Sequence, residues 1–216
     1  LFHCMGCVLG VLGCVASGAA MVILESFSPE RVMGAIQDEK STGIYGVPST
    51  YISILGHRRF DQYDFSSLRF GLMSGSVCPE PLIREVMERM GMKAIVIPYG
   101  QTETSPAITM TGMVESDEHR FRTVGNVLGG IEMELRDPVT RKPVAVGEQG
   151  EICVRGTRLT LGYYNNPEVT AKAFVQNPLN SLYPELIYRT GDLGKLNERG
   201  ELEFAGRKDY QIKHMG

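Results

Sequence analysis

The sequence has no concentration of positive charge. Its 216 residues include 22 lysines and arginines against 25 aspartates and glutamates, for a formal net charge of -3. The two signs are mixed along the chain, whereas nucleic-acid binding requires a basic patch or stripe. We therefore expect no nucleic-acid partner. Internal repeats and low-complexity tracts are also absent, and 43% hydrophobic residues are sufficient for a globular core.

Cysteine is too scarce and too unevenly placed for a disulfide framework, which favours a reducing compartment. Cys4 and Cys7 have the spacing of a zinc or redox site with His3 beside them, but no second ligand pair follows at a usable distance. We therefore favour buried structural cysteines over a metal site. The five cysteines are Cys4, Cys7, Cys14, Cys78 and Cys153.

The sequence begins without an initiator methionine, a signal peptide or a basic leader, so we expect it to be a piece of a longer protein. No charged residue occurs from Leu1 to Leu24, which is long enough to raise the question of a membrane span. Glycines interrupt this run. A buried helix ending at Ser17-Gly18, followed by a buried parallel strand from Ala19 to Leu24, explains the same composition. We expect no transmembrane span; the alternative, a membrane anchor, predicts dependence on detergent.

From Ser28 onward, helix and strand patterns alternate as in an α/β protein. Ser28-Pro29-Glu30 predicts a capped helix with Val32, Met33 and Ile36 on one side. Ligands of open parallel sheets bind beyond the carboxyl ends of the strands, where Ser74-Gly75-Ser76 and Tyr99 to Glu103 lie. The predicted strands are Thr42 to Val47, Leu68 to Met73 and Lys93 to Pro98, and further helices are predicted to begin at Pro48 and Pro79.

After about Gly112 the pattern changes to short strands separated by turn residues. Gly130 to Arg136 and Gly150 to Arg155 are predicted strands, and a short helix is predicted near Glu168 to Phe174. The predicted fold is therefore a parallel α/β subdomain over residues 1–112, followed by a small antiparallel, barrel-like β subdomain over residues 113–205.

Three polar clusters follow one another along this pattern, and the first is Tyr99-Gly100-Gln101-Thr102-Glu103. Tyr99 offers a flat face for a purine, and Thr102 offers a hydroxyl for a phosphate oxygen. Glu103 offers carboxylate oxygens, which are the ligands that Mg²⁺ prefers. The cluster alone has the ordinary interpretation of a polar turn.

The second and third clusters supply complementary groups. In the second, Tyr188 to Asp192, the Thr190-Gly191 pair predicts a tight turn that aims the Asp192 oxygens outward at ribose hydroxyls. In the third, Gly206 to Lys213, Arg207 offers a fixed fork of donors for phosphate or ribose oxygens. Three such clusters in order favour a nucleotide site over three unrelated surface turns.

In this order the clusters resemble the signature of the adenylate-forming ligase superfamily, which includes acyl-CoA synthetases, amino-acid adenylating domains and luciferases. The resemblance covers nearly the whole chain. It implies that Tyr99 stacks on adenine, that Thr102 contacts the phosphate and that Glu103 binds Mg²⁺. The other nucleotide-binding residues that it implies are Gly75 and Ser76 in the adenine wall, Gly100, Asp192 at the ribose hydroxyls and Arg207 at ribose or phosphate.

The resemblance also assigns roles near both ends of the chain. Asp209 aligns with the pivot of a small C-terminal domain, so residues 206–216 are predicted to form a hinge against which that missing domain packs. Lys213 resembles the lysine that serves the thioester-forming conformation. His3 matches the position that gates the acyl pocket. The ordinary alternatives are a charged surface hairpin for Asp209 and Lys213, and a packed side chain for His3.

The reaction implied by the resemblance has two steps. A carboxylate attacks the α-phosphorus of ATP to give an acyl-adenylate and pyrophosphate, while Mg²⁺ and cationic groups offset the developing charge. A thiol, from coenzyme A or a carrier's phosphopantetheine, then displaces AMP. The family's phosphate loop would precede Leu1 and its adenylation lysine would follow Gly216, so we expect this chain to be a poor catalyst alone. The candidate catalytic residues are His3, Thr102, Glu103 and Lys213.

The acid is expected to be a medium-chain fatty acid or an aromatic acid. The first half of the chain most resembles medium-chain fatty acyl-CoA synthetases, whereas the last third is closer to bacterial ligases that load amino acids onto carrier proteins. Met5, Met73 and Val77 would suit an alkyl chain, and an amino acid would need a buried carboxylate. An amino-acid or aryl-acid ligase and a non-catalytic, truncated nucleotide-binding relative stay open. The expected location is the cytoplasm, or the mitochondrion for a eukaryotic source.

Overall fold

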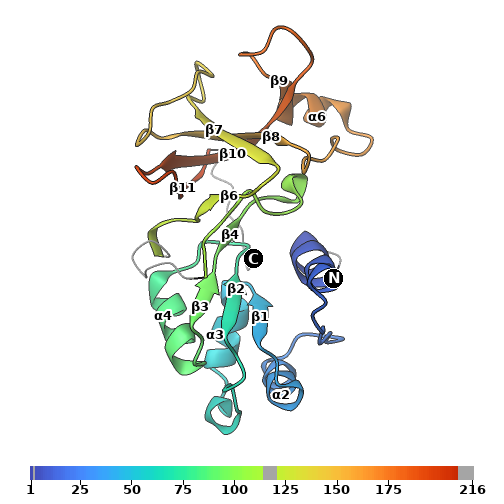
Figure 1. Cartoon of the computed structure of the whole chain (residues 1–216), viewed down its shortest axis with the longest axis vertical. Coiled ribbons are helices and arrows are strands. Elements are labelled where there is room, and N and C mark those ends of the chain that lie inside the picture. The colour runs from blue at the N-terminus through green and yellow to red at the C-terminus, as the bar shows by residue number, and fades with distance from the viewer. Residues whose placement is uncertain (2, 114–120, 209–216) are drawn as a thin grey trace. The chain divides into compact units, whose positions relative to one another are not determined.

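The computed structural model describes residues 1, 3–113 and 121–208 (Figure 1). They form two compact units. The α/β unit contains residues 1, 3–98, 111–113 and 121, and the β unit contains residues 99–110 and 122–208. The chain passes from one unit to the other at Pro98-Tyr99, earlier than the boundary that we predicted at residue 112. Of the predicted hinge, residues 206–208 belong to the β unit and residues 209–216 lie outside the described part of the chain.

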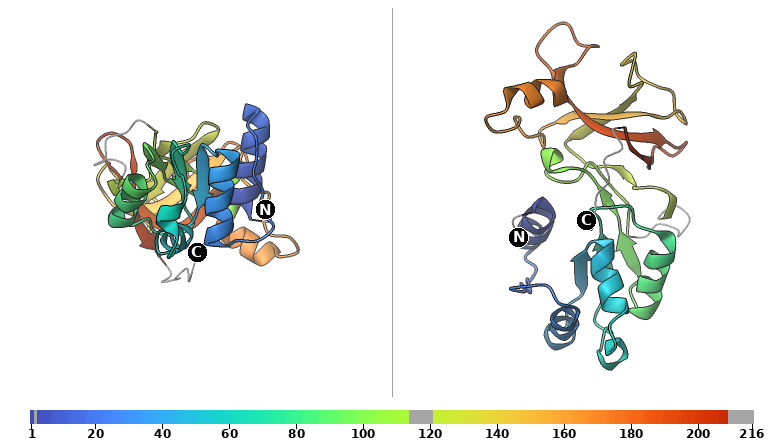
Figure 2. Two further views of the ribbon diagram at one scale, coloured as in Figure 1. Left: turned by 90° about the horizontal axis from the view of Figure 1, so that it is seen from below. Right: turned by 180° about the vertical axis from the view of Figure 1, so that it is seen from behind.

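The α/β unit is built on a parallel three-stranded sheet in the order β1-β2-β3, as predicted. Helix α3 contacts β1, and α4 contacts β3. Helix α3 also packs against both α2 and α4 (Figure 2). The elements of this unit are η1 (Met5–Leu12), α1 (Gly13–Ser17), α2 (Pro29–Glu39), β1 (Gly43–Gly46), α3 (Pro48–Leu55), η2 (Phe60–Gln62), β2 (Phe70–Met73), α4 (Glu80–Arg89) and β3 (Ala94–Val96).

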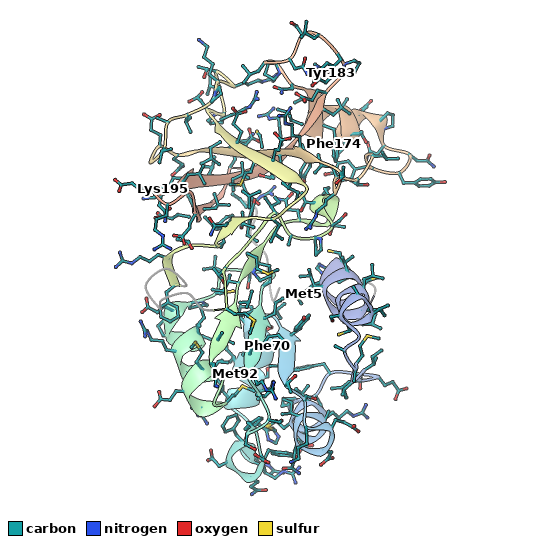
Figure 3. The ribbon with its side chains drawn as sticks, viewed as in Figure 1. Met5, Phe70, Met92, Phe174, Tyr183 and Lys195 are labelled. Atoms are coloured by element: carbon teal, nitrogen blue, oxygen red, sulfur yellow. The ribbon has the colours of Figure 1, made fainter. Side chains whose placement is uncertain are left out.

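Local sequence accounts for the ends and the packing of these elements. The Ser28 hydroxyl accepts a hydrogen bond from the Arg31 amide at 3.2 Å, so α2 has the predicted cap. The single O–H of buried Tyr51 of α3 is shared between the Ile44 and Leu72 carbonyls at 3.1 and 2.9 Å, which ties the helix to two strands. Strand β2 begins at Phe70 (Figure 3), and Gly71 follows it. Gly71 has no room for a side chain, because a Cβ there would lie 2.9 Å from the Tyr51 hydroxyl.

The prediction for the first 24 residues is only partly confirmed. Helices η1 and α1 are present, and α1 ends at Gly18 in the left-handed conformation, as predicted. Ala19 to Leu24 form no strand, and neither helix has a buried residue. The predicted burial of the helix and the predicted strand are therefore both wrong, because an apolar run alone does not specify hydrogen-bonded pairing with the edge of a sheet.

The cysteine prediction is also corrected, since Cys7 is exposed, Cys4 is half-buried and Cys153 alone is buried. The residues described here contain no group of three or more histidines, cysteines or carboxylates that could hold a metal ion. Within the same residues, no helix combines the length and the apolar character needed to cross a membrane.

The β unit is an antiparallel sheet in the order β11-β10-β8-β7, with β9 also paired to β10, as the turn-rich sequence predicted. A second small sheet has the order β4-β5-β6. The elements are β4 (Pro98–Tyr99), η3 (Thr102–Thr104), β5 (Thr109–Met110), β6 (Asn126–Val127), β7 (Ile131–Arg136), β8 (Gly150–Gly156), α6 (Pro167–Ala173), β9 (Phe174–Gln176), β10 (Leu186–Leu196) and β11 (Leu202–Arg207).

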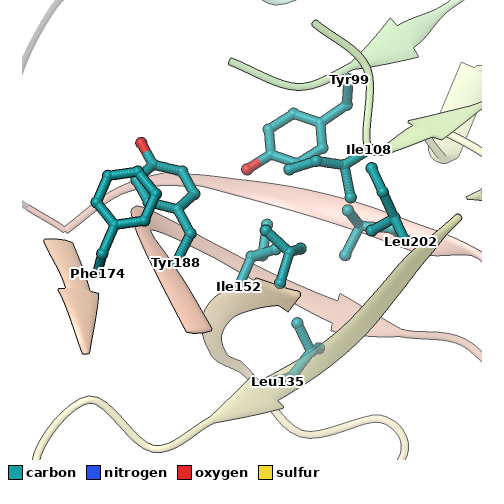
Figure 4. Close-up of a cluster of buried hydrophobic side chains, with 9 residues drawn as sticks. Tyr99, Ile108, Leu135, Ile152, Phe174, Tyr188 and Leu202 are labelled. Carbon is teal, nitrogen blue, oxygen red and sulfur yellow. The ribbon is translucent and has the colours of Figure 1, made fainter. Parts of the chain in front are cut away.

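Side chains alternate between the two faces of the large sheet, and the face that carries the hydrophobic cluster of Figure 4 is called the core face here. Tyr188 packs on Phe174 with ring centroids 4.8 Å apart, and Tyr99 packs on Phe204 at 5.5 Å. The opposite, outer face carries mostly charged side chains: Glu132, Glu134 and Arg136 of β7, Glu151 and Arg155 of β8, and Arg189 of β10.

Candidate functional site

A bulge in β10 determines the position of Asp192. Before the bulge Arg189 pairs with Cys153, and after it Leu193 pairs with Glu151, so three residues of β10 lie opposite a single residue of β8. Gly191 lies within the bulge at φ 72°, in the left-handed region that favours glycine. The predicted tight turn is therefore wrong, because these residues form an irregularity inside a continuous strand.

The Asp192 carboxylate is held by two residues of the first polar cluster, Tyr99 and Gln101, and by Arg207 of the third. Oδ2 accepts hydrogen bonds from the Tyr99 hydroxyl at 2.8 Å and from Gln101 Nε2 at 2.7 Å. Oδ1 accepts from Arg207 Nη1 at 3.2 Å, and the two residues are cross-strand partners. Asp192 is only 4% exposed, so our prediction that its oxygens point outward is wrong. These bonds use three of the carboxylate's roughly four acceptor positions.

Gln101 connects the first cluster to the second. Its Nε2 also donates to the Thr190 carbonyl at 3.0 Å, and its Oε1 accepts a hydrogen bond from the Tyr188 hydroxyl. Its backbone is fixed as well, because the Gln101 amide donates to the buried Thr104 hydroxyl at 3.1 Å. Gln101 belongs to the first cluster, but neither the sequence pattern nor the family resemblance predicts a role for it.

Tyr99 lies in the hydrophobic cluster and is 8% exposed. Figure 4 shows its hydroxyl pointing toward the side of the cluster where Tyr188 lies. Burial, and secondly the Asp192 charge, raise the pKa of Tyr99 well above its ordinary value, so the phenol is a neutral donor. Gly100 has a packing role, because a Cβ there would lie 2.1 Å from the Pro106 carbonyl oxygen. Contact of Tyr99 and Gly100 with a nucleotide stays a prediction.

Thr102 and Glu103 lie on the short turn η3. Thr102 is exposed, and Glu103 is half-buried with its Oε1 accepting a hydrogen bond from the Tyr163 hydroxyl at 2.7 Å. The segment that carries Tyr163 is attached to the same turn, because the Thr160 amide donates to the Glu103 carbonyl at 2.9 Å. The carboxylate is a hard oxygen ligand of the type that Mg²⁺ uses together with substrate phosphates and waters. The chemistry of this position therefore fits the predicted metal.

The other two tyrosines of the site are also neutral donors. Burial, and secondly the hydrogen bond to Glu103, raise the pKa of Tyr163. Burial, and secondly the Glu103 charge, raise the pKa of Tyr188. Sequence reasoning did not select Tyr163, whose position in Gly162-Tyr163-Tyr164 has no local signal of function.

Three predicted site residues belong to the α/β unit. Gly75 follows β2 at φ 91°, and a Cβ there would lie 2.9 Å from Val47 Cγ1. Ser76 beside it is exposed. His3 is exposed, and its Nδ1 accepts a hydrogen bond from the Met5 amide at 3.2 Å at the start of the first helix. Lys213 and Asp209 lie outside the described residues.

The chain belongs to the family whose model is described as AMP-binding enzyme, which matches residues 1–164. This is the superfamily that the polar clusters resembled. Four of the clusters' predicted site residues, Asp192, Arg207, Asp209 and Lys213, lie beyond the matched range.

Two curated relatives and one solved structure are similar to nearly the whole chain. The Bacillus subtilis (strain 168) protein YngI is 45% identical over 98% of this chain and 37% of its own length. Rat medium-chain acyl-CoA ligase ACSF2, a mitochondrial protein, is 33% identical over 99% of this chain and 34% of its own. The ATP-bound structure of MatB from Rhodopseudomonas palustris is 25% identical, with a TM-score of 0.80 over 97% of this chain and 39% of that one. The chain thus spans about a third of the length of these curated relatives.

Proposed function

We propose that the β unit binds the adenosine part of ATP in an AMP-forming activation of a carboxylic acid. The observation that supports this is the Asp192 carboxylate, buried in a bulge and surrounded by Tyr99, Gln101 and Arg207. A buried carboxylate with one acceptor position in reserve is suited to the hydroxyl donors of a ribose. Arg207 beside it supplies positive charge for the ribose or phosphate oxygens.

Glu103 is proposed to hold Mg²⁺, which would supply neutralising charge for the ATP phosphates. Tyr163 would orient the carboxylate through its 2.7 Å hydrogen bond, and Thr102 on the same turn would contact the phosphate. The attacking group is the substrate's own carboxylate, so no side-chain nucleophile is needed. The residues of this chain bind and orient the reactants and offset charge.

A medium-chain fatty acid and coenzyme A are the proposed acid and thiol, and the name of the similar rat ligase supports both. Of the side chains predicted to suit an alkyl chain, Met73 is fully buried and Val77 is 72% exposed. An aryl or amino acid passed to a carrier protein is the alternative. His3 at the acyl pocket, Lys213 in thioester formation and Asp209 as a pivot complete the proposal, with a cytoplasmic or mitochondrial location.

The test is calorimetric titration of the 216-residue chain with AMP and with a non-hydrolysable octanoyl-adenylate analogue. Tighter binding of the octanoyl analogue, lost in Asp192→Ala, is expected if the adenylate site is formed and an apolar acyl pocket adjoins it. Equal affinities for the two ligands would contradict the acyl pocket but not the nucleotide site. No binding of either ligand to a sample that unfolds cooperatively would overturn the nucleotide site.

A further inference from the structure

We propose that Gln101 is the positioning residue for Asp192, and that its side-chain amide makes the site selective for nucleotides that carry ribose hydroxyls. The inference rests on the proposed function, because it assigns a task to a side chain beside the proposed ribose ligand. Gln101 itself acts through Asp192.

The hydrogen bonds around Gln101 allow one amide orientation. Nε2 faces two acceptors, Asp192 Oδ2 at 2.7 Å and the Thr190 carbonyl at 3.0 Å. Oε1 faces the Tyr188 hydroxyl, which donates to it. A flipped amide would place its oxygen against two oxygens that can only accept, Asp192 Oδ2 and the Thr190 carbonyl, so the network excludes it.

This arrangement selects glutamine among residues of similar size. Glutamate would place a second carboxylate against Asp192, where no cation other than Arg207 contacts the carboxylate among the described residues. Methionine would fill the volume but would supply neither donor to Asp192 nor acceptor to Tyr188. Both replacements keep the shape of the side chain and remove the amide's donors.

The amide also fixes which oxygen of Asp192 keeps acceptor capacity. Tyr99 and Gln101 both donate to Oδ2, whereas Arg207 is the only donor to Oδ1 among the described residues. With two donors on Oδ2, the carboxylate cannot rotate without losing a buried hydrogen bond, so Oδ1 stays oriented for an incoming hydroxyl. Gln101 thereby holds the Asp192 carboxylate in one orientation, in which Oδ1 serves as the acceptor for a ligand hydroxyl.

The experiment measures the dissociation constants of AMP and 2′,3′-dideoxy-AMP for the 216-residue chain and for Gln101→Glu, by calorimetry at fixed salt. The matched control is Gln149→Glu, which makes the same chemical change at an exposed glutamine of the same unit. We expect the wild-type chain and the control to bind AMP about tenfold more tightly than the dideoxy nucleotide, the value of one charge-assisted hydrogen bond. In Gln101→Glu this ratio should fall to about one.

A preserved ratio in a folded Gln101→Glu variant would overturn the positioning role while leaving the proposed function intact. A wild-type chain that binds neither nucleotide would overturn both. If Gln101→Glu fails to unfold cooperatively, the neutral Gln101→Met variant replaces it, and the same loss of the ratio is expected. A merely structural role would weaken both nucleotides equally and leave the ratio unchanged, which also counts against the inference.

Discussion

Two buried carboxylates on opposite faces of the same sheet have different kinds of partner. Glu151 of β8, on the outer face, is 2% exposed and accepts hydrogen bonds from Arg189 and from Lys208, the latter at 3.1 Å. Asp192 of β10 is 4% exposed and has, among the described residues, one cationic partner, Arg207, with the neutral Tyr99 and Gln101. Cations on both sides neutralise Glu151, whereas one cation and two neutral donors hold Asp192.

The comparison distinguishes a structural carboxylate from one that can take a ligand. Each carboxylate accepts two hydrogen bonds on one oxygen and one on the other among the described residues. All three donors at Glu151 belong to cations, whereas two of the three at Asp192 are neutral, so the Asp192 charge is offset less. On the proposed function, the charge of the partners, and not burial alone, separates the two carboxylates.

The largest effect is expected from Glu151→Gln. It leaves Arg189 and Lys208 without their carboxylate partner, and we expect a loss of about 3 kcal/mol in the free energy of unfolding, measured by urea denaturation. The affinity for AMP should stay within about twofold, because the residue lies on the outer face. A large loss of affinity without a loss of stability would remove the distinction between the two faces.

Asp192→Asn should have the opposite profile. We expect its affinity for AMP to fall about tenfold, since a charged acceptor of ribose hydroxyls becomes a neutral amide. Its free energy of unfolding should change less than that of Glu151→Gln, because two of the three donors that it faces are neutral. Calorimetry and urea denaturation on the same preparation measure both quantities. Unchanged affinity would contradict the assignment of Asp192.

Asn177→Ala sharpens the account of the outer face. The Asn177 side-chain oxygen accepts a hydrogen bond from Arg136 Nη2 at 2.9 Å, and Arg136 is 4% exposed. Arg136 Nη1 has no hydrogen-bond partner among the described residues. Asn177→Ala leaves Glu134 as the remaining partner of Arg136 Nη2 among the described residues and also removes the Asn177 hydrogen bond to Glu185. We expect the free energy of unfolding to fall by about 2 kcal/mol without a change in AMP affinity. An effect below about 0.5 kcal/mol would show that water replaces the amide.

A smaller effect per residue is expected at high pH. Burial raises the pKa of Tyr99 and Tyr188 in the folded chain, whereas both titrate near 10 when unfolded. Their contribution to stability is complete below pH 10 and declines above it, because the unfolded state then releases protons that the folded state retains. We expect each of the two tyrosines to contribute a loss of about 1 kcal/mol between pH 10 and pH 11. The loss should be smaller in Tyr188→Phe, and an equal loss in that variant would contradict the assignment.

Local patterns predicted much of the α/β unit. Ser28-Pro29 capped a helix as expected, and the alternation from Gly43 to Val96 gave the parallel sheet. The apolar run from Ala19 to Leu24 did not form a strand, because hydrophobicity indicates burial but does not provide a pairing partner. The family resemblance selected Asp192 and Arg207, which the fold makes cross-strand partners.

The supporting side chains could not be predicted in the same way. Gln101 contacts Tyr188 and Asp192 across 87 and 91 residues of sequence. Tyr163 reaches Glu103 across 60 residues. Periodicity and turn signals act over a few residues, so contacts of this kind appear only after the strands have been placed in register.

The most direct measurement is the nuclear magnetic resonance of side-chain amides during a titration with AMP. The Gln101 side-chain signals report on the core face and are assigned by their absence in Gln101→Glu. The Asn177 side-chain signals report on the outer face and are assigned by their absence in Asn177→Ala. The account predicts that AMP shifts the Gln101 pair in a saturable way and leaves the Asn177 pair unchanged. Shifts confined to Asn177, or no shift in either pair at saturating AMP, would contradict a nucleotide site at Asp192.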